Sequence, residues 1–455
     1  MELSYKRTFA YKTADEKKLK NVFDYCEKYK KFLNDGKTER EAVSTAVDLL
    51  EKNGYRSYDL ADKIVPGDKL FYNNRGKGLF IIKAGKNDIA KNGIKILVAH
   101  VDSPRLDIKQ NPLYEDDDSN VAFFKTHYYG GIRKYQWLTI PLALHGVIAL
   151  KSGEVVSVRI GENENDPVFY ITDLLPHLAY EDDTKAVNKA FSAENLNIVL
   201  GGIPYKDEDK KAVKRNVLEI LNKTYGVTEE DFLSAELEAV PANKARDVGF
   251  DRAFIASYGH DDRVCAFPEI TATVETETDE TVLTILADKE EIGSEGVTGM
   301  KCRLIGDLID RIAESYGVSS AVVRSRSKCL SADVTAAYDP NYSHVFEKLN
   351  ACFSGYGVAM SKFTGSRGKS GSNDTSAEYI AYLRRIFERD GVVWQAGELG
   401  KVDIGGGGTV AKFLAEYNID VVDLGVPVLS MHAPYELISK IDVYEAHKAF
   451  SAFIK

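Results

Sequence analysis

A short apolar run, Thr281-Val282-Leu283-Thr284-Ile285, constrains the fold of this chain more than any other stretch. Its β-branched residues predict a buried strand, and two adjacent carboxylates, Glu290 and Glu291, follow it before a glycine-bearing turn. In open α/β sheets, ligands bind beyond the carboxyl ends of the strands. One carboxylate at such a junction can bind a metal while the other holds a water, as a metallohydrolase requires. The alternative is a solvated acidic turn, which this chain also makes at Glu229-Glu230.

Strand-like and helix-like segments alternate on both sides of a middle portion of different texture. Before that portion, two helices are expected between residues 13 and 54, and strands at 69–72, 78–84 and 94–99. After it, strands are expected at 321–324, 393–395 and 421–431, and helices at 304–316, 376–389, 410–417 and 443–453. Such alternation predicts an α/β fold, with a mostly parallel sheet flanked by helices.

The middle portion consists of short strand-like pieces at 121–124, 137–140 and 155–160, followed by a charged, helix-prone stretch at 206–238. We interpret residues 111–242 as an inserted, mainly β domain, with a catalytic α/β domain formed by residues 1–110 and 243–455. A chain of 455 residues is too long for one ordinary core, which favours this division. The charge runs of the insert indicate a solvated face or subunit contacts.

Bulk properties exclude several classes of partner. A net charge of −10 argues against nucleic-acid binding. No stretch approaches the roughly 20 apolar residues of a membrane-spanning helix, and the first residues lack the apolar core of a signal peptide. Five scattered cysteines indicate reduced packing residues. We therefore expect a cytoplasmic protein with no nucleic-acid or membrane partner.

Other apolar segments also carry histidine or acidic residues to their ends. These residues are His100 and Asp102 after 94–99, Asp261 and Asp262 at the start of an apolar helix, Asp333, and His432 after 421–431. Each has a structural alternative: a histidine satisfied at a strand end, or an acidic helix cap. Mixed imidazole and carboxylate ligands suit Zn²⁺, with Mn²⁺ or Co²⁺ as alternatives, and two-metal hydrolases use such sets.

As an ordered set, these motifs resemble the aspartyl aminopeptidase and vacuolar aminopeptidase I family of zinc aminopeptidases. The motifs are Ala99-His100-Val101-Asp102-Ser103-Pro104, His260-Asp261-Asp262-Arg263, Asp288-Lys289-Glu290-Glu291-Ile292-Gly293-Ser294, Ser331-Ala332-Asp333 and Ser430-Met431-His432. The resemblance spans nearly the whole chain. It implies a zinc-peptidase type of fold, self-association through the inserted dimerisation domain, and a tetrahedral dodecamer.

The resemblance also implies a role for each matching residue. The implied ligands of two zinc ions are His100, Asp261, Glu291, Asp333 and His432, with Asp261 bridging the ions. Glu290 would be the general base acting on a metal-bridging water, and Asp102 would orient His100. The implied activity is hydrolysis of the N-terminal residue, acidic or neutral, from peptides. Two positions depart from the pattern: Lys289 replaces a common histidine, and Glu181 replaces a histidine found in some members.

Two weaker features accompany the motifs. Lys369, in a Gly/Ser-rich loop, matches a family lysine near the substrate and could attract an acidic side chain, although surface lysines are usually solvated. The four glycines 405–408 could present backbone N–H groups to an oxyanion, or form a flexible turn.

Two rival functions are compatible with the same residues. One is a two-metal carboxypeptidase or deacylase, and the other is a non-catalytic assembly protein that keeps a structural metal site. Release of the N-terminal residue from unblocked peptides separates the aminopeptidase from the first rival, and loss of turnover without loss of metal separates it from the second.

Overall fold

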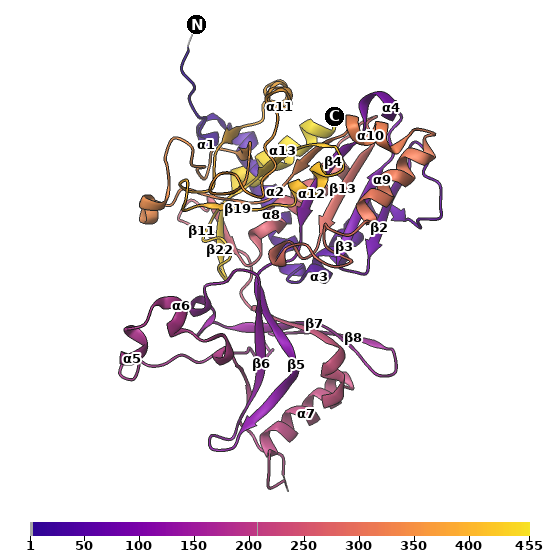
Figure 1. Ribbon diagram of the computed structural model, residues 1–455. Helices are drawn as coiled ribbons and strands as arrows, with labels where there is room; N and C mark the ends of the chain where they lie inside the picture. Colours follow the sequence, from indigo (N-terminus) through magenta and orange to yellow (C-terminus); the bar gives the residue numbers. More distant parts are fainter. Residues whose placement is uncertain (1–2, 207) are drawn as a thin grey trace. The chain divides into compact units, whose positions relative to one another are not determined.

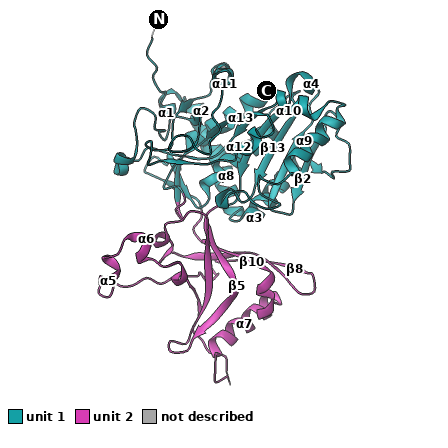
Figure 2. Ribbon diagram, in the orientation of Figure 1, with its two compact units in different colours: residues 1–102, 245–431, 436–455 teal, residues 103–244, 432–435 magenta. Residues whose placement is uncertain are grey.

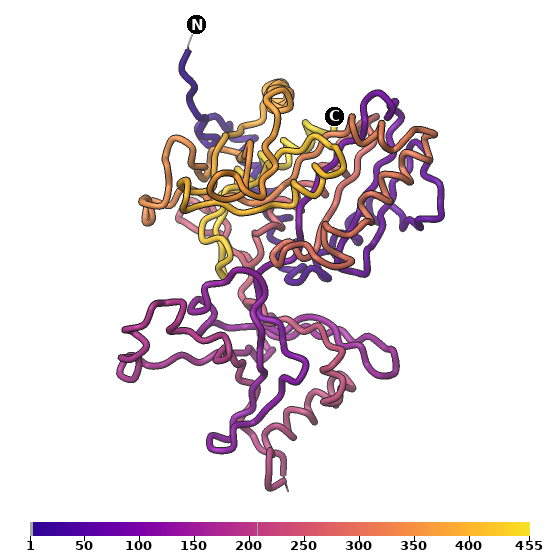
Figure 3. The backbone as a smooth tube through the Cα atoms, viewed as in Figure 1, coloured from indigo at the N-terminus to yellow at the C-terminus, as the bar shows by residue number. Residues whose placement is uncertain are grey.

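A computed structural model describes residues 3–206 and 208–455, which are divided between two units (Figure 1). The first unit comprises residues 1–102, 245–431 and 436–455, and the second comprises residues 103–244 and 432–435 (Figure 2). Segments from both ends of the chain therefore build the first unit, as the indigo, orange and yellow parts of the tube show (Figure 3). Each unit has its own sheet and its own helices.

The main sheet of the first unit is parallel at its centre, with antiparallel pairs on each side of the centre and a parallel pair at each edge. In spatial order its strands are β1 (Arg56–Ser57), β2 (Lys69–Asn74), β3 (Gly78–Lys83), β13 (Val282–Ala287), β4 (Lys95–His100), β14 (Lys328–Ser331), β20 (Asp420–Gly425), β16 (Val358–Ser361) and β18 (Trp394–Ala396). The central strands β13, β4, β14 and β20 run parallel to one another. Strand β3 is antiparallel to β13, and β16 is antiparallel to β20. The expected mixed α/β class is confirmed.

Helices cover both faces of this sheet, because its central strands are apolar on both sides. Every residue of β3, β4 and β13 is buried. One apolar core lies against α2 (Glu16–Asp35), α3 (Glu39–Lys52), α8 (His260–Glu275), α11 (Ala377–Arg389) and α13 (Lys440–Ile454). The other lies against α9 (Leu304–Ser315), α10 (Ser320–Arg326) and α12 (Ala411–Ala415). Short helices α1 (Ala10–Thr13) and α4 (Ile89–Asn92) complete the unit.

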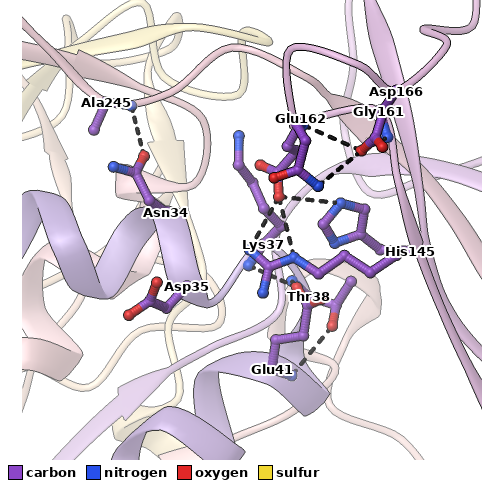
Figure 4. Close-up of polar contacts among 12 residues, drawn as sticks. Asn34, Asp35, Lys37, Thr38, Glu41, His145, Gly161, Glu162, Asp166 and Ala245 are labelled. Atoms are coloured by element: carbon purple, nitrogen blue, oxygen red, sulfur yellow. Dashed lines mark hydrogen bonds and ion pairs between the residues drawn. The ribbon is translucent and has the colours of Figure 1, made fainter.

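The two expected N-terminal helices are α2 and α3. The side chain of Asp15 caps α2 by accepting a hydrogen bond from the Lys18 N–H. Thr38 and Glu41 form a capping box at the start of α3. The Ala245 N–H donates to the Asn34 side chain at 2.8 Å, which ties the end of α2 to the segment where the chain re-enters the unit (Figure 4).

Two expected strands are wrong, and a third is divided in two. Residues 321–324 lie in helix α10, where Val323 is buried and Val322 is exposed. The prediction failed because so short an apolar run fits the periodicity of a helix as well as that of a strand. The expected strand at 421–431 is divided into β20 and β21 (Pro427–Leu429). The division falls after Gly425, where the chain passes from the main sheet to a smaller one and an added Cβ would lie 1.7 Å from the Asp333 carbonyl oxygen. In the second unit, the strand expected at 137–140 is replaced by the last residue of a 3₁₀ turn, η1 (Lys134–Trp137), and by turn and bend residues 138–140.

Smaller sheets complete the first unit. One has the order β11 (Arg246–Val248), β12 (Phe254–Ser257), β22 (Glu436–Ser439), β21 and β15 (Thr335–Ala336). A second pairs β17 (Gly365–Ser366) with β19 (Gly406–Gly407). The 3₁₀ turns are η4 (Glu290–Ile292) and η5 (Pro340–Val345).

The second unit is built on an antiparallel sheet with one longer helix. Its strands, in spatial order, are β8 (Val155–Ile160), β7 (Leu142–Ala149), β10 (Ala235–Pro241), β5 (Arg105–Asp116), β6 (Val121–Tyr129) and β9 (Ile198–Gly201). The remaining elements are α5 (Tyr180–Asp183), α6 (Val187–Ala190), α7 (Ala212–Tyr225), η2 (Ala193–Asn195) and η3 (Glu229–Ser234). His145 is buried in this unit with its Nε2 3.5 Å from the Glu162 carboxylate (Figure 4).

In the described part of the chain, no helix has both the length and the apolar character needed to cross a bilayer.

Candidate metal centre

Three adjacent strands of the main sheet end at the same edge, and acidic residues follow each of them. Strand β4 ends at His100, which is in register with Ala287 at the end of β13. On the other side of β4, Ser331 of β14 pairs with Val98. Because the strands are parallel, their continuations converge beyond the carboxyl edge of the sheet, where open α/β folds bind ligands.

His100 and two aspartates form the centre of this cluster. The His100 Nε2 atom lies 3.2 Å from Asp261 Oδ1 and 4.0 Å from Asp333 Oδ1. All three come from separate segments: the end of β4, the start of α8 and the turn after β14. The His100 ring is 1 % exposed, so its contacts with these carboxylates lie away from bulk water.

Asp102 connects the histidine to the pair of glutamates. Its carboxylate lies 3.3 Å from His100 Nδ1, and its carbonyl oxygen lies 3.0 Å from the same nitrogen. The carboxylate oxygens also accept hydrogen bonds from the Glu290 N–H at 3.1 Å and the Glu291 N–H at 3.2 Å. One side chain thereby fixes the ring of His100 and the turn η4 after β13.

Backbone contacts position Asp261 and His100. The Asp261 N–H donates to Glu436 Oε2 at 3.1 Å, and the His100 N–H donates to Asp262 Oδ2 at 3.3 Å. The Asp261–Asp262 peptide bond is cis. Arg263 is buried and donates from Nη2 to the carbonyl oxygens of Val101 and Lys37, each at 3.0 Å. The two residues that follow Asp261 therefore hold the backbone of His100 and Val101.

The cluster carries more negative charge than its own side chains neutralise. Burial raises the pKa of Asp333 well above its usual range, and the nearby Glu290 carboxylate adds to this shift. Burial also raises the pKa of Asp262. Burial opposes the charged form of His100, yet hydrogen bonds to Asp102 and Asp261 raise its pKa well above the usual value. Each shift favours bringing positive charge into the cluster.

The side chains are suitable for metal binding. One ligand atom each from His100, Asp261 and Asp333 lie within 4.8 Å of one another, and the same holds for His100, Glu290 and Glu291. Oxygens of Asp261 and Glu291 are equally close. Imidazole and carboxylate donors of this kind match the ligand preferences of Zn²⁺.

Two further predicted site residues, His432 and Lys369, have contacts of their own. His432 belongs to the second unit, where its Nδ1 lies 2.8 Å from the Gly131 carbonyl oxygen, and its membership of the metal set stays a prediction. Lys369 pairs with Asp374 at 3.0 Å and lies over the ring of Phe363, 3.8 Å from its centroid. Its loop follows β17, which pairs with β19 in the glycine-rich loop. The two weaker sequence features are therefore neighbours.

The sequence alone did not reveal the roles of Asp262, Arg263 and Glu436. All three act on backbone groups of segments distant in the chain, which no local pattern records. His260 was named only within a motif. It is buried, with Nδ1 2.7 Å from the Tyr29 hydroxyl and Nε2 3.1 Å from the Ile255 carbonyl oxygen. Burial lowers its pKa to about 3, so it is a neutral packing residue.

Comparison with known proteins decides the family. A family model described as Aminopeptidase I zinc metalloprotease (M18) matches residues 32–454. A probable M18 family aminopeptidase 1 of Clostridium acetobutylicum is 50% identical over 455 residues, covering 98% of this chain and 97% of the relative. The chain belongs to the M18 family of zinc aminopeptidases. It is a metallo-aminopeptidase, a hydrolase acting on peptide bonds, as the family resemblance implied.

Solved M18 structures share its fold. The crystal structure of an M18 aminopeptidase from Thermotoga maritima has a TM-score of 0.95 at 41% identity and covers 99% of this chain and 100% of that one. Aminopeptidase I of Clostridium acetobutylicum has a TM-score of 0.92 at 46% identity, with complete coverage of both chains. The mApe1 dodecamer of S. cerevisiae has a TM-score of 0.78 at 23% identity over 95% of this chain and 97% of that chain, which shows the fold alone.

Proposed function

We propose that this M18 aminopeptidase removes the N-terminal residue of peptides with two divalent metal ions, zinc in the first instance. The proposed ligands are His100, Asp261, Glu291, Asp333 and His432. The observation that carries the proposal is the convergence of His100, Asp261 and Asp333 at one sheet edge, beside a turn bearing Glu290 and Glu291. Manganese and cobalt remain alternatives by the same ligand chemistry.

Glu290 is proposed as the general base. When bound, the metal ions would polarise the scissile carbonyl and make a water more acidic. Glu290 takes the proton of the attacking water and passes it to the leaving amine. Asp102 fixes the backbone N–H of Glu290 and the ring of His100, so base and ligand keep a constant spacing. A half-buried position at the start of η4 leaves Glu290 accessible to substrate.

Lys369 is proposed to contact the substrate. Its ammonium group is partly exposed, in a loop that also contains Asp374. The positive charge of Lys369 would attract an acidic N-terminal side chain of the substrate. A neutral N-terminal side chain would gain nothing from this charge, and Lys369 would then stay paired with Asp374. Activity toward acidic and neutral aminoacyl substrates therefore measures the contribution of Lys369 directly.

Replacement of the base tests the proposed mechanism. We expect Glu290→Gln to lower kcat by about 10²–10⁴, because the proton acceptor is lost, while bound metal measured by elemental analysis stays unchanged. Glu295→Gln, an exposed position close by, is the matched control and should keep wild-type activity. A panel of aminoacyl chromogenic substrates, with chelator and metal add-back, completes the test. Wild-type turnover in Glu290→Gln would eliminate this residue as the base.

The end of the peptide that is cleaved separates the aminopeptidase from its nearest enzymatic rival. An unblocked peptide should lose its first residue, and an N-acetylated peptide of the same sequence should stay intact. Release of the C-terminal residue would favour a two-metal carboxypeptidase instead.

Self-association through the inserted domain, residues 111–242, is proposed as well. The second unit exposes apolar side chains along one stretch of chain: Val168, Tyr170, Leu174, Leu175, Leu178, Tyr180 and Val187. Exposed apolar patches of this kind mark protein interfaces. A dodecamer, the assembly named for the yeast relative, is the expected particle, and sedimentation measures it. A cytoplasmic location is proposed because Cys26, Cys265, Cys329 and Cys352 are buried free thiols.

A further inference from the structure

A pocket of about 450 Å³ lies in the first unit at the amino ends of β4 and β14. This is the edge of the main sheet opposite the one that carries His100. Helices α4 and α10 lie side by side at this edge (Figure 1). The residues that matter for the charge of its lining are Lys91, Lys95, Glu280, Arg326, Lys328 and Tyr382.

The lining is strongly basic within an acidic chain. Four cationic side chains and one carboxylate, Glu280, line the pocket, which gives a net charge of +3 from these residues, whereas the whole chain carries −10. A local excess of this size in a chain of opposite sign focuses the field on anions that approach the pocket.

Two of the cations are placed directly beside one another. Lys95 and Lys328 are register partners in the neighbouring parallel strands β4 and β14. Like charges side by side on one face of a sheet destabilise it. Lys95 is also only 8 % exposed, so little solvent lies around it to screen the repulsion between the two lysines.

Aromatic contacts hold the two lysines without neutralising them. The Lys95 ammonium group donates to the Tyr382 hydroxyl at 2.7 Å. Lys95 Nζ lies 5.2 Å and Lys328 Nζ 5.5 Å from the centroid of the same Tyr382 ring. Each cation–π contact is worth about 0.5–1 kcal/mol at a partly exposed site, but it leaves both positive charges in place.

The positions of the other two cations, Lys91 and Arg326, can be explained by helix ends, whereas those of Lys95 and Lys328 cannot. Lys91 and Arg326 lie in the last turns of α4 and α10, where basic residues favour the helix dipole. Arg326 Nη1 also donates to the Lys91 carbonyl oxygen at 3.4 Å, which uses one of its five donors. Lys95 and Lys328 instead begin strands, so no helix end accounts for their juxtaposition.

We propose that this pocket binds a small anion with several negatively charged oxygens, such as a phosphate or a tricarboxylate. Such an anion can accept charge-assisted hydrogen bonds from ammonium and guanidinium groups together, and it removes the repulsion between Lys95 and Lys328. The volume accommodates an anion of this size. The proposal is independent of the aminopeptidase activity, because the pocket lies at the opposite edge of the sheet from the metal cluster.

Calorimetric titration with inorganic phosphate and with propane-1,2,3-tricarboxylate tests this site. At pH 7 and low salt we expect saturable binding with a Kd below about 1 mM, weakened by added sodium chloride. The double variant Lys91→Ala/Arg326→Ala should bind at least tenfold more weakly. Lys63→Ala/Arg303→Ala removes the same charge from exposed positions outside the pocket lining and should bind like the wild type. It also keeps the metal cluster unchanged, so anion binding there would be equal in both variants.

Equal affinity of the two double variants, or the absence of saturable binding by the wild type up to about 10 mM, would overturn the proposal. Thermal unfolding gives a second readout on the lysine pair. Lys328→Met removes one of the paired charges, so the anion-free variant should unfold no lower than the wild type and should lose the rise in Tm caused by tricarboxylate. A rise in Tm as large as that of the wild type would also overturn it.

Discussion

The carboxylate of Asp102 links two segments of the chain that are far apart in sequence. It contacts the ring of His100 and accepts hydrogen bonds from the backbone N–H groups of Glu290 and Glu291. Neighbouring residues in the chain thus serve the metal cluster in different ways: His100 offers a ligand atom, and Asp102 sets the position of the proposed base. Substitution of a residue that hydrogen-bonds to a metal ligand and orients it commonly lowers metal affinity or activity by about 10–100-fold.

Asp102→Asn tests this positioning role. An amide cannot accept both N–H groups, so we expect kcat to fall by about 10–100-fold with a smaller change in KM, measured on an aminoacyl substrate. Asp442→Asn is the matched control, because Asp442 also accepts two backbone N–H groups, from Gly355 and Gly357, away from the chemistry. The control should lower Tm and keep kcat. Wild-type kcat in Asp102→Asn would refute the role.

Asp423 gives the fold a pH dependence. It is buried on β20, and burial raises its pKa to about 7, although hydrogen bonds from Thr409 and Ser331 oppose the shift. The folded state therefore binds a proton that the unfolded state releases near pH 4, and this contribution to stability is lost as pH rises from about 4 to 7. Over that window, the free energy of unfolding falls by roughly 4 kcal/mol at most because of Asp423.

We expect Asp423→Asn to match the wild type in Tm near pH 4, to exceed it progressively up to about pH 7, and to keep a constant advantage from there to pH 8. The exposed residue Asp420 on the same strand supplies the control variant Asp420→Asn, whose difference from the wild type should not follow pH in this way. Thermal unfolding across the pH series measures both. A constant difference in Tm for Asp423→Asn would contradict the shifted pKa.

At the scale of elements, the break between β20 and β21 places one of the proposed ligands. Gly425 passes so close to the turn after β14 that a Cβ would lie 1.7 Å from the Asp333 carbonyl oxygen. The absence of a side chain at this point lets the two backbones pack together. Residue type at Gly425 thereby controls the position of Asp333, although Gly425 itself offers no ligand atom.

Gly425→Ala should displace Asp333 and lower both bound metal and kcat. The substitution adds a single methyl group, so overpacking of about 1–3 kcal/mol is expected as well, visible as a lower Tm. Gly202→Ala, at a position with no neighbouring atom within 4 Å of the added Cβ, is the control and should leave metal content, kcat and Tm unchanged. Full metal occupancy in Gly425→Ala would contradict the packing argument.

Much of this arrangement follows from the sequence, because parallel strands bring their carboxyl ends to one edge. The runs before His100 and Glu290 are mostly apolar, and both become buried central strands. The contacts of Asp262 and Glu436 could not be predicted, since they join side chains to backbone groups of distant segments. The expected strand at 321–324 failed because a four-residue apolar run does not distinguish a strand from a buried helical turn. The metal-binding roles themselves stay predictions.

At the scale of the whole molecule, metal removal should loosen the first unit. The buried carboxylates of Asp262 and Asp333 have raised pKa values, so a cation that binds the cluster stabilises the folded state. A ligand at about 100 times its Kd adds roughly 2.7 kcal/mol. We expect chelation to lower Tm and zinc add-back to restore it, measured by calorimetry. An unchanged Tm after verified metal removal would contradict this coupling.

The interleaved strand order of the main sheet has a consequence for synthesis on the ribosome. Strand β13 lies between β3 and β4, yet it follows them in the chain only after residues 103–244, the contiguous part of the second unit. At 5–20 residues per second, roughly 180 residues of elongation leave two apolar strands without their shared neighbour for about 10–40 s. The contiguous insert can fold during that interval, so we expect the nascent host unit to close last and to depend on chaperones until it does.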